Sequence, residues 1–301
     1  MSKKTNFLTP RYWPIWLIIG LLKLLIKLPY KSQLTIGRVI GWFMYKIPSK
    51  MRHTSLVNLR LCYPELSEQE QMQLLRRNFA AVGIGVMEMA LGWWASDAKI
   101  KQLAHIQGFE YIENALKKSK GVILCSAHFT SLELAGRLIA KSAPIVAMYR
   151  SQKHPLFEKI TKHAREQHYH RLIQREDIRG MLRCLKDNLC VWYAADIDAG
   201  AKNSVFVPFF GVPAASITAT SRYAKISGAA VIPVAFYRRD DGSGYDLIAQ
   251  PALEGFPTDN IEADITRVNQ ALENTIRQKP DQYLWQYKRF KTRPEGQKRF
   301  Y

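Results

Sequence analysis

The chain has 301 residues, of which 47% are hydrophobic. This composition excludes an intrinsically disordered protein and is sufficient for the core of one large α/β domain or two small ones. Lysine and arginine number 44 against 25 acidic residues, so the net charge of +19 predicts an acidic partner: nucleic acid, anionic lipid or an acidic protein. The four cysteines form no C-x-x-C pair and lie in or beside apolar runs, which indicates buried free thiols.

The segment from Trp13 to Tyr30 is the most hydrophobic part of the chain. Its uncharged run ends before Lys23 and is shorter than the roughly 20 apolar residues that span a bilayer. Three interpretations remain open: a short single span whose lysines reach the interface, a helix lying in the interface, and a buried helix of the domain. Lys3 and Lys4 precede the segment, and further basic residues follow it, which indicates contact with anionic lipid on both flanks.

A second amphipathic helix is expected from Leu34 to Ile47, on the same surface. We therefore assign residues 1–50 to membrane attachment and residues 51–301 to an α/β domain. A long helix is predicted from Ser67 to Trp94, because Ser67 suits a helix N-cap and apolar residues recur after it. Gly83 and Gly85 are expected to bend or interrupt this helix.

From residue 105 onward, short apolar strands alternate with helices of 10 to 15 residues. The predicted strands are Gly121–Cys125, Pro144–Met148, Leu189–Ala194 and Ala230–Phe236. The predicted helices between or after them are Ser131–Lys141, Leu156–Gln167, Ile178–Asn188 and Ser216–Ser227. A strand at Tyr245–Ala249 pairs with the strand before it, and a helix covers Ile261–Gln278. This rhythm predicts one mostly parallel sheet covered by helices on both faces.

The first of these strands leads directly to a candidate catalytic pair, His128 and Glu133. A histidine at a strand end, with a glutamate in the first turns of the next helix, predicts an imidazole base held by a carboxylate. The same His-x4-Glu spacing occurs at His105 and Glu110, so spacing alone is weak evidence. We expect His105 to precede an ordinary polar turn, without a strand-to-helix transition.

The residues around His128 resemble a known superfamily. The segment CSAHFTSLEL, followed by Met148–Arg150 and His154–Leu156, is similar to the first two blocks of the lysophospholipid acyltransferases. Further segments resemble the bacterial lipid A secondary acyltransferases, which transfer lauroyl and myristoyl chains: Arg175–Met181, Val191–Gly200, Ser204–Ala214, Ser227–Arg239 and Gln282–Gly296. One departure is Tyr287, where that family's pattern leads us to expect histidine.

The resemblance implies a glycerol-3-phosphate acyltransferase-like α/β fold with an N-terminal membrane-anchoring helix, at the cytoplasmic face of the inner membrane. It implies acyl transfer from acyl carrier protein to a hydroxyl of a lipid A precursor, without a metal or other cofactor. His128 would remove the hydroxyl proton, since a neutral imidazole with a pKa of about 6.5 suits that task. Glu133 would fix the tautomer, and Arg165, by resemblance, or Arg150 would stabilise the oxyanion. Nucleophilic attack by Ser126 or Cys125 is the alternative, although neither lies in a G-x-S-x-G turn.

Two further groups are candidate substrate contacts. Asp196 and Asp198 follow an apolar strand; they are interpreted as a substrate-positioning or structural pair, with a metal site as the alternative. Lys288 and Arg289 lie in an aromatic-rich basic run. They are interpreted as contacts for acceptor phosphates or acyl carrier protein, or as an ordinary solvated or lipid-facing surface.

Two rival functions remain at this point. One is a glycerolipid or mannoside acyltransferase of the same superfamily that uses acyl-CoA. The other is a non-catalytic basic protein that binds membranes or nucleic acid, although no nucleic-acid-binding module is recognisable, and we expect no nucleic-acid partner.

Overall fold

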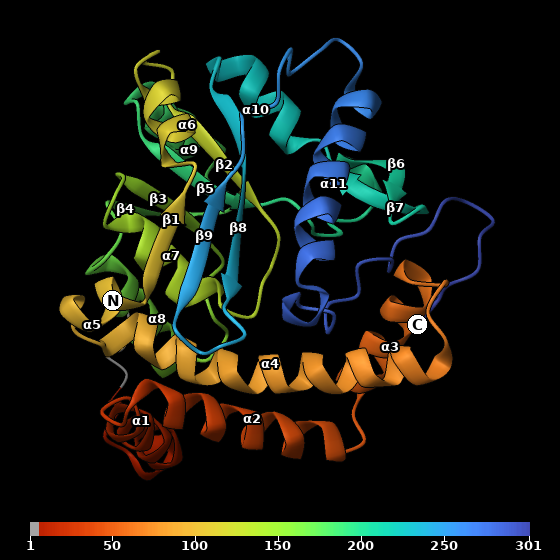
Figure 1. Cartoon of the computed structure of the whole chain (residues 1–301). Helices are drawn as coiled ribbons and strands as arrows, with labels where there is room; N and C mark the ends of the chain where they lie inside the picture. Colours follow the sequence, from red (N-terminus) through yellow and green to blue (C-terminus); the bar gives the residue numbers. More distant parts are fainter. Residues whose placement is uncertain (1–5) are drawn as a thin grey trace.

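The computed structural model describes residues 6–301, so Lys3 and Lys4 lie outside the described residues. Its centre is a seven-stranded sheet with the order β1-β9-β8-β2-β5-β3-β4 (Figure 1). The strands of this sheet are β1 (Ala104–Gln107), β2 (Val122–Ser126), β3 (Ile145–Tyr149), β4 (Arg171–Gln174), β5 (Cys190–Ala194), β8 (Ala230–Arg238) and β9 (Tyr245–Ala249). The run from β8 to β4 is parallel, whereas β9 is antiparallel to β8 and carries β1 parallel to itself. The predicted mostly parallel sheet is confirmed.

Helices surround this sheet. The α-helices are α1 (Trp13–Leu25), α2 (Tyr30–Lys46), α3 (Lys50–Cys62), α4 (Glu68–Trp94), α5 (Asp97–Leu103), α6 (Phe109–Leu116), α7 (Leu132–Ala140), α8 (Pro155–Glu166), α9 (Ile178–Lys186), α10 (Ala219–Ser227) and α11 (Ile261–Gln278). A separate antiparallel hairpin consists of β6 (Ser204–Phe209) and β7 (Val212–Ile217). The helix at 261–278 has the predicted bounds, and the bounds of the helices predicted at 131–141, 156–167 and 178–188 differ from the prediction by at most two residues.

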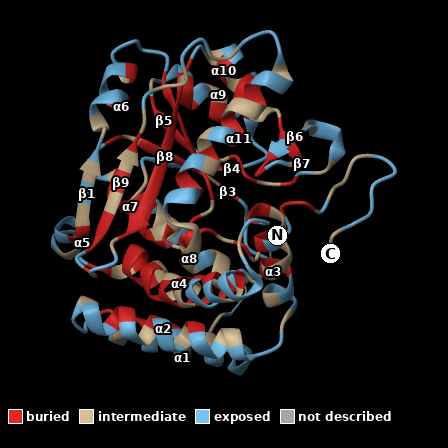
Figure 2. Cartoon of the chain, turned by 45° about the vertical axis from the view of Figure 1, so that its right-hand side comes forward, coloured by how far each residue is buried: buried red, intermediate tan, exposed pale blue. Residues whose placement is uncertain are grey.

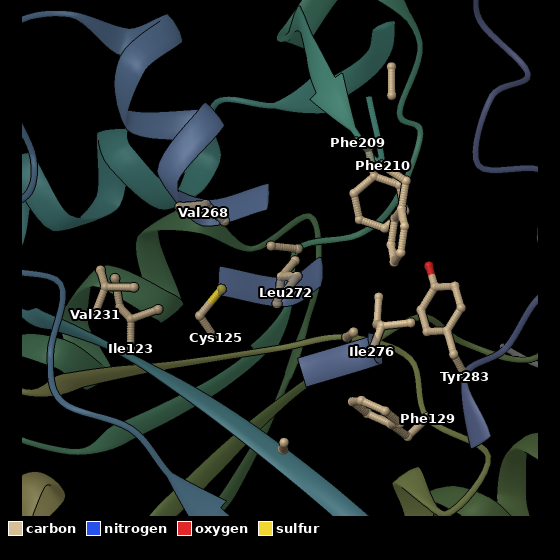
Figure 3. Close-up of a cluster of buried hydrophobic side chains, with 14 of the residues drawn as sticks. Ile123, Cys125, Phe129, Phe209, Phe210, Val231, Val268, Leu272, Ile276 and Tyr283 are labelled. Atoms are coloured by element: carbon tan, nitrogen blue, oxygen red, sulfur yellow. The ribbon is translucent and has the colours of Figure 1, made fainter. Parts of the chain in front are cut away.

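The alternation of side chains along β2 divides the interior into two hydrophobic cores. Ile123 and Cys125 point to one face, where they join Val268 and Leu272 of α11 (Figure 3). Val122 and Leu124 point to the other face, where they pack with residues of α6 and α7. Because successive strand residues face opposite sides of a sheet, a strand that is apolar throughout requires helices on both faces.

Helix α4 packs across the ends of the strands of the sheet and contributes to both cores (Figure 1). Its N-terminal half supplies Leu75 and Phe79 to the first core, and its C-terminal half supplies Met87 and Leu91 to the second. It begins with a capping box, in which the Ser67 side chain accepts from a backbone N–H and Glu70 bonds back to Ser67.

Helix α4 runs without a break from Glu68 to Trp94, so the expected interruption at Gly83 or Gly85 does not occur. These two glycines are close-packing positions instead. A Cβ on Gly83 would lie 2.2 Å from the carbonyl oxygen of Gly37 on α2, and one on Gly85 would lie 2.8 Å from that of Thr130. Gly41 on α2 is equally restricted, since its Cβ would lie 2.2 Å from the Phe79 carbonyl oxygen. Glycine thus lets α2 and the loop after β2 approach the backbone of α4.

The outward sides of α1 and α2 expose large apolar side chains. On α1 these include Trp13, Leu17 and Leu21, and on α2 they include Trp42 and Phe43. Figure 2 shows α2 with buried residues toward α4 and exposed residues on its outer side. Within residues 6–301, no helix has both the length and the apolar character required to cross a membrane, so the predicted single span is not supported.

The structure also contains strands that the sequence did not predict. Strands β1 and β4 have four residues each and lie at the two edges of the sheet, where they carry exposed side chains. Residues 216 and 217 belong to β7, so α10 begins at Ala219 rather than at Ser216. All four cysteines are free and buried, as expected.

Candidate active site

The candidate site lies where three neighbouring parallel strands reach their carboxyl ends. His128 follows β2, Asp196 follows β5, and Arg150 follows β3, and these strands are consecutive in the sheet. Ser126 is paired with Ala194 in the register of β2 and β5, so both chains leave the sheet side by side. In α/β proteins the carboxyl ends of the parallel strands are the usual position of a ligand site.

His128 is held by Asp196. Its Nδ1 lies 2.6 Å from Oδ1 of Asp196, and its backbone N–H donates to Oδ2 at 3.0 Å. Tyr283 donates its hydroxyl to the same Oδ2 at 2.9 Å. The Asp196 side chain is 2% exposed, whereas that of His128 is 32% exposed. The buried carboxylate therefore fixes the Nδ1–H tautomer and leaves Nε2 as the ring nitrogen that can accept a proton.

His128 and Asp196 each stabilise the charged form of the other. Burial acts to lower the pKa of His128, but the charge and hydrogen bond of Asp196 outweigh burial and raise that pKa above its usual value. Burial acts to raise the pKa of Asp196, but His128 and the Tyr283 hydroxyl lower it below its usual value. Burial and Asp196 raise the pKa of Tyr283 well above its usual range, so its hydroxyl remains a donor. The lowered pKa of Asp196 favours its charged form as the partner of the imidazole.

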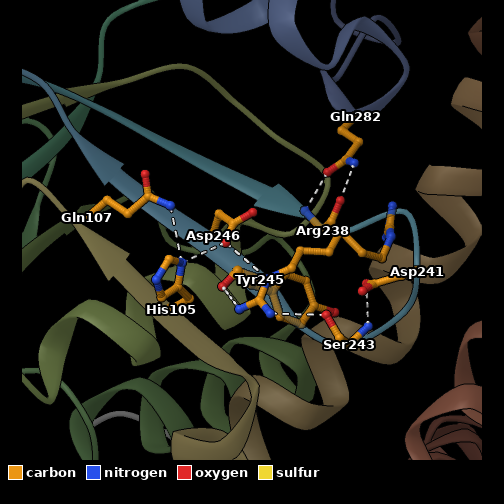
Figure 4. Close-up of polar contacts among 9 residues, drawn as sticks. His105, Gln107, Arg238, Asp241, Ser243, Tyr245, Asp246 and Gln282 are labelled. Carbon is orange, nitrogen blue, oxygen red and sulfur yellow. Dashed lines mark hydrogen bonds and ion pairs between the residues drawn. The ribbon is translucent and has the colours of Figure 1, made fainter.

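A C-terminal segment supports the loop that carries His128. Leu284 donates its N–H to the carbonyl of His128, and Thr130 donates to the carbonyl of Gln282, both at 2.8 Å. Gln282 is in turn fixed to the backbone of Arg238 on β8 by two hydrogen bonds (Figure 4). Figure 3 shows Tyr283 and Phe129 beside Ile276 of α11, in the first core. The loop is therefore clamped between α4 and this segment.

Glu133 does not have the expected partner. Its carboxylate accepts from both Nε (3.2 Å) and a terminal nitrogen of Arg165, and from the indole N–H of Trp93 at 3.0 Å. Within residues 6–301, Glu133 forms no hydrogen bond with His128, and the predicted His128–Glu133 contact is corrected to His128–Asp196. The physical reason is strand order: β5 lies beside β2 and brings Asp196 to the imidazole, while α8 brings Arg165 to Glu133.

His128, Glu133, Arg165 and Arg150 nevertheless line one pocket of about 210 Å³. Apolar side chains, among them Trp192, complete its wall. Arg165 is largely buried and neutralised by Glu133, whereas Arg150 is exposed and forms no ion pair within the described residues. The pocket thus combines an available imidazole nitrogen with two guanidinium groups, one fixed by a carboxylate and one open to a ligand.

The alternative nucleophiles are poorly placed for attack. The hydroxyl of Ser126 is buried and donates to the carbonyl of Ala127 at 3.0 Å. Cys125 is buried, and burial together with Asp196 raises the pKa of its thiol to about 12. A thiol with such a pKa stays protonated and is a weak nucleophile near neutral pH.

The remaining predicted substrate contacts differ in accessibility. Asp198 is buried and accepts from the backbone and hydroxyl of Thr292, while Tyr287 bonds to its backbone N–H and carbonyl. Arg289 is only 2% exposed and donates to Ala215 and Ser216 on β7. Lys288 is exposed, with its ammonium 5.3 Å from the ring centroid of Tyr301.

The second His-x4-Glu pair has a different environment, but not for the expected reason. His105 lies in β1 and Glu110 in the first turn of α6, so a strand-to-helix transition does occur here. His105 bonds to Asp246 and Gln107, and its side chain is 57% exposed (Figure 4). Surface exposure, rather than a missing transition, distinguishes it from His128.

Sequence reasoning missed Tyr283 and Trp93 as members of the site. The available signal for Tyr283 was its place in the segment Gln282–Gly296, which carried part of the resemblance. The support that Tyr283 gives to Asp196 depends on a contact across 87 residues of sequence, and neither spacing nor periodicity reports such a contact.

Comparison with known proteins identifies the family. The sequence pattern of the family described as bacterial lipid A biosynthesis acyltransferase matches residues 1–292. The chain belongs to this family. It is 37% identical over 293 residues to the lipid A biosynthesis lauroyltransferase of Escherichia coli K12, covering 97% of this chain and 96% of that protein.

Two further lipid A acyltransferases are similar to this chain. The lipid A biosynthesis palmitoleoyltransferase of the same organism is 35% identical and covers 98% of this chain and 97% of its own. The myristoyltransferase is 29% identical and covers 97% of this chain and 91% of its own. Membership in this family supports an enzyme that transfers acyl groups in lipid A biosynthesis. It argues against the alternative of a non-catalytic basic protein that binds membranes or nucleic acid.

Proposed function

We propose that this acyltransferase moves a fatty acyl chain from acyl carrier protein to a hydroxyl of a lipid A precursor, with His128 as the general base. The observation that carries the proposal is the hydrogen-bonded series Tyr283–Asp196–His128 at the wall of the pocket. Asp196 holds Nδ1, so Nε2 accepts the proton of the acceptor hydroxyl as that oxygen attacks the thioester carbonyl. Positioned base catalysis of this kind contributes about 10²–10⁴ in rate.

The thioester oxygen gains negative charge during the attack, and a nearby cation would stabilise it. Arg165 is one candidate, with Glu133 fixing its guanidinium in the pocket. Arg150 is the other, because its charge is not already neutralised within the described residues. We assign Glu133 to positioning Arg165 and Asp196 to positioning His128. The collapse of the tetrahedral intermediate releases the carrier thiolate, which takes up the proton, so no covalent acyl-enzyme forms.

We further propose that the enzyme works at the cytoplasmic face of the inner membrane, with the exposed apolar sides of α1 and α2 in the interface. The support is the set of large apolar side chains on these helices, including Trp13 and Trp42. Amphipathic helices with interfacial tryptophans bind membranes in this manner. The net charge of +19 favours both anionic lipid and an acidic carrier protein.

The test is mass spectrometry of lipid A from cells that contain or lack the protein, which reports acceptor, chain length and position together. His128→Ala should abolish the added chain. His105→Ala is the matched control, because His105 shares the His-x4-Glu spacing but lies on the surface. Full acylation by a folded His128→Ala variant would refute the base mechanism.

A further inference from the structure

A second pocket, of about 640 Å³, lies between α2 and α4, away from the catalytic pocket. Helix α2 supplies Arg38, Trp42 and Lys46, and α4 supplies Arg76. Ala80 of α4 also lines this pocket, and it lies 13 positions before Trp93, which contacts Glu133. At 1.5 Å per residue this separation corresponds to roughly 20 Å along the helix. The pocket is therefore distinct from the acyl-transfer site.

The charge of this pocket is unbalanced. Arg38, Lys46 and Arg76 all line it, and no acidic side chain among residues 6–301 does. None of the three cations forms an ion pair within that described part of the chain. An adjoining pocket shares Arg38 and differs in charge, because Asp240 and Asp281 line it together with Arg77. The three cations of the larger pocket, which has no acidic lining residue among those described, are complementary to a phosphate group.

Aromatic side chains that line the pocket contact two of these cations. Arg76 donates to the hydroxyl of Tyr45 at 3.4 Å, and its guanidinium lies 5.9 Å from the centroid of that ring. The ammonium of Lys46 lies 5.5 Å from the centroid of the Trp42 ring. Contacts between cations and aromatic rings restrict where the charges lie without neutralising them.

Exposed apolar side chains also line this pocket. Val39 and Trp42 lie on α2, as do Arg38 and Lys46, and are 50% and 53% exposed. Phe43, which follows Trp42 in the sequence, is 56% exposed. These residues belong to the outer side of α2, the surface already proposed to contact the membrane. A ligand that satisfies both kinds of side chain has a phosphate for the cations and a hydrocarbon chain for the apolar surface.

We propose that this pocket binds the headgroup phosphate of an anionic membrane phospholipid, with one acyl chain of the same lipid along Val39 and Trp42. The proposal rests on the proposed contact of α1 and α2 with the bilayer. It adds a lipid site that docks the enzyme through one bound molecule, in addition to the general attraction of positive charge to the surface.

Trp42 provides a direct test, because bromine on an acyl chain quenches a neighbouring indole. Two vesicle preparations contain equal amounts of phosphatidylglycerol and phosphatidylcholine and differ only in which lipid is brominated. The quenching of Trp42 is obtained as the difference between the natural protein and the Trp42→Phe variant. Stronger quenching by brominated phosphatidylglycerol is expected. Equal quenching by both preparations would overturn the proposal.

Substitution of the cations provides the second test. Each cation near an anionic surface strengthens partitioning roughly fivefold, so Arg38→Gln with Arg76→Gln should weaken vesicle binding roughly 25-fold and abolish the selective quenching. The control is Arg179→Gln with Arg183→Gln, an equal change of charge on α9, at the end of the sheet away from α2 (Figure 1). The control should change binding less than about twofold, because screening confines the surface potential to about 10 Å. Equal loss in both double variants would contradict a specific site.

Two further arms distinguish the source of the phosphate. Inorganic phosphate, compared with sodium chloride at equal ionic strength, should leave the selective quenching intact; selective loss with phosphate would indicate a free-phosphate site. In the second arm, the phosphorylated acceptor and unbrominated phosphatidylglycerol compete separately with brominated phosphatidylglycerol, and the loss of Trp42 quenching is measured. The acceptor should be no better a competitor than unbrominated phosphatidylglycerol. If it is a better competitor, the pocket binds the acceptor. These measurements do not depend on acyl transfer and use the His128→Ala variant. A failure of the proposed catalytic mechanism would therefore not change their result. A complete lack of vesicle binding would refute the membrane contact as well.

Discussion

Replacement of Asp196 by asparagine tests the central contact of the site. Among residues 6–301, two donors point at Oδ2, the backbone N–H of His128 and the Tyr283 hydroxyl, while the single partner at Oδ1 is Nδ1 of His128. The amide oxygen should therefore occupy the Oδ2 position, and the NH2 group should face Nδ1. An NH2 group donates, so the imidazole proton moves to Nε2, the atom that must accept the proton of the acceptor. We expect kcat/KM to fall about 10²–10⁴-fold, or about 3–5 kcal/mol.

The pH dependence of the same variant gives an independent readout. His128 acts as a base only when neutral, and Asp196 raises its pKa, so the acidic limb of kcat/KM in the natural enzyme lies above the usual histidine value. Without the carboxylate charge that pKa falls, so the limb should move to lower pH. The amide still makes three hydrogen bonds, so we expect the unfolding free energy to change by only about 1–2 kcal/mol.

The matched control is Glu133→Gln. Because Glu133 bonds to Arg165 and Trp93, its neutral variant should lower the rate without moving the acidic limb. The assay is acyl transfer from acyl carrier protein in detergent micelles between pH 5.5 and 8.5, a range chosen to bracket the usual histidine pKa of about 6.5. If Glu133→Gln moved the limb while Asp196→Asn kept kcat/KM within about threefold, Glu133 would be the partner of His128 after all.

Three other substitutions probe the support of the site. Tyr283→Phe removes one hydrogen bond to Asp196, so kcat/KM should fall roughly 3- to 10-fold, about 1 kcal/mol, with KM unchanged. Gly83→Ala forces α2 away from α4 and should lower the unfolding free energy by about 1–3 kcal/mol in denaturant titrations. Arg289→Met removes two buried hydrogen bonds and should likewise reduce stability, by about 2–4 kcal/mol, while KM for the acceptor stays constant.

Each of these has an outcome that contradicts it. A normal rate in Tyr283→Phe would mean that Asp196 needs no support from the C-terminal segment. Gly20→Ala on α1 is the control for Gly83, since a Cβ at Gly20 meets nothing within 4 Å; equal destabilisation by both would exclude the packing argument. A folded, stable Arg289→Met variant with a raised KM would restore the substrate contact predicted for Arg289.

Regular, fully buried elements were predictable from the sequence. The strands β2, β3, β5 and β8 are continuous apolar runs because both of their faces are covered. Strands β1 and β4 were difficult to predict because each has only four residues. The sequence of β4 does not alternate between apolar and polar residues, and the alternation in β1 covers only those four residues. The hairpin β6–β7 was missed for a similar reason, since Pro208 and Pro213 face each other in its register and interrupt the strand pattern.

The candidate site was predictable only in part. The position of His128 at the end of a strand follows from local sequence, and so does the presence of Glu133 in the next helix. Which carboxylate reaches the imidazole depends on the order of strands in the sheet, and no local pattern encodes that order. The sequence spacing favoured Glu133, whereas the adjacency of β2 and β5 selects Asp196.

The clamp on the His128 loop also bears on how the enzyme is made. Residues 282–284, which hold the loop and Asp196, follow His128 by about half of the chain. A chain emerging from the ribosome therefore carries α1, α2 and His128 long before it carries the residues that orient His128. Under the proposed function, the nascent protein would reach the bilayer in an inert form, and acyl transfer would begin only after this late segment has docked.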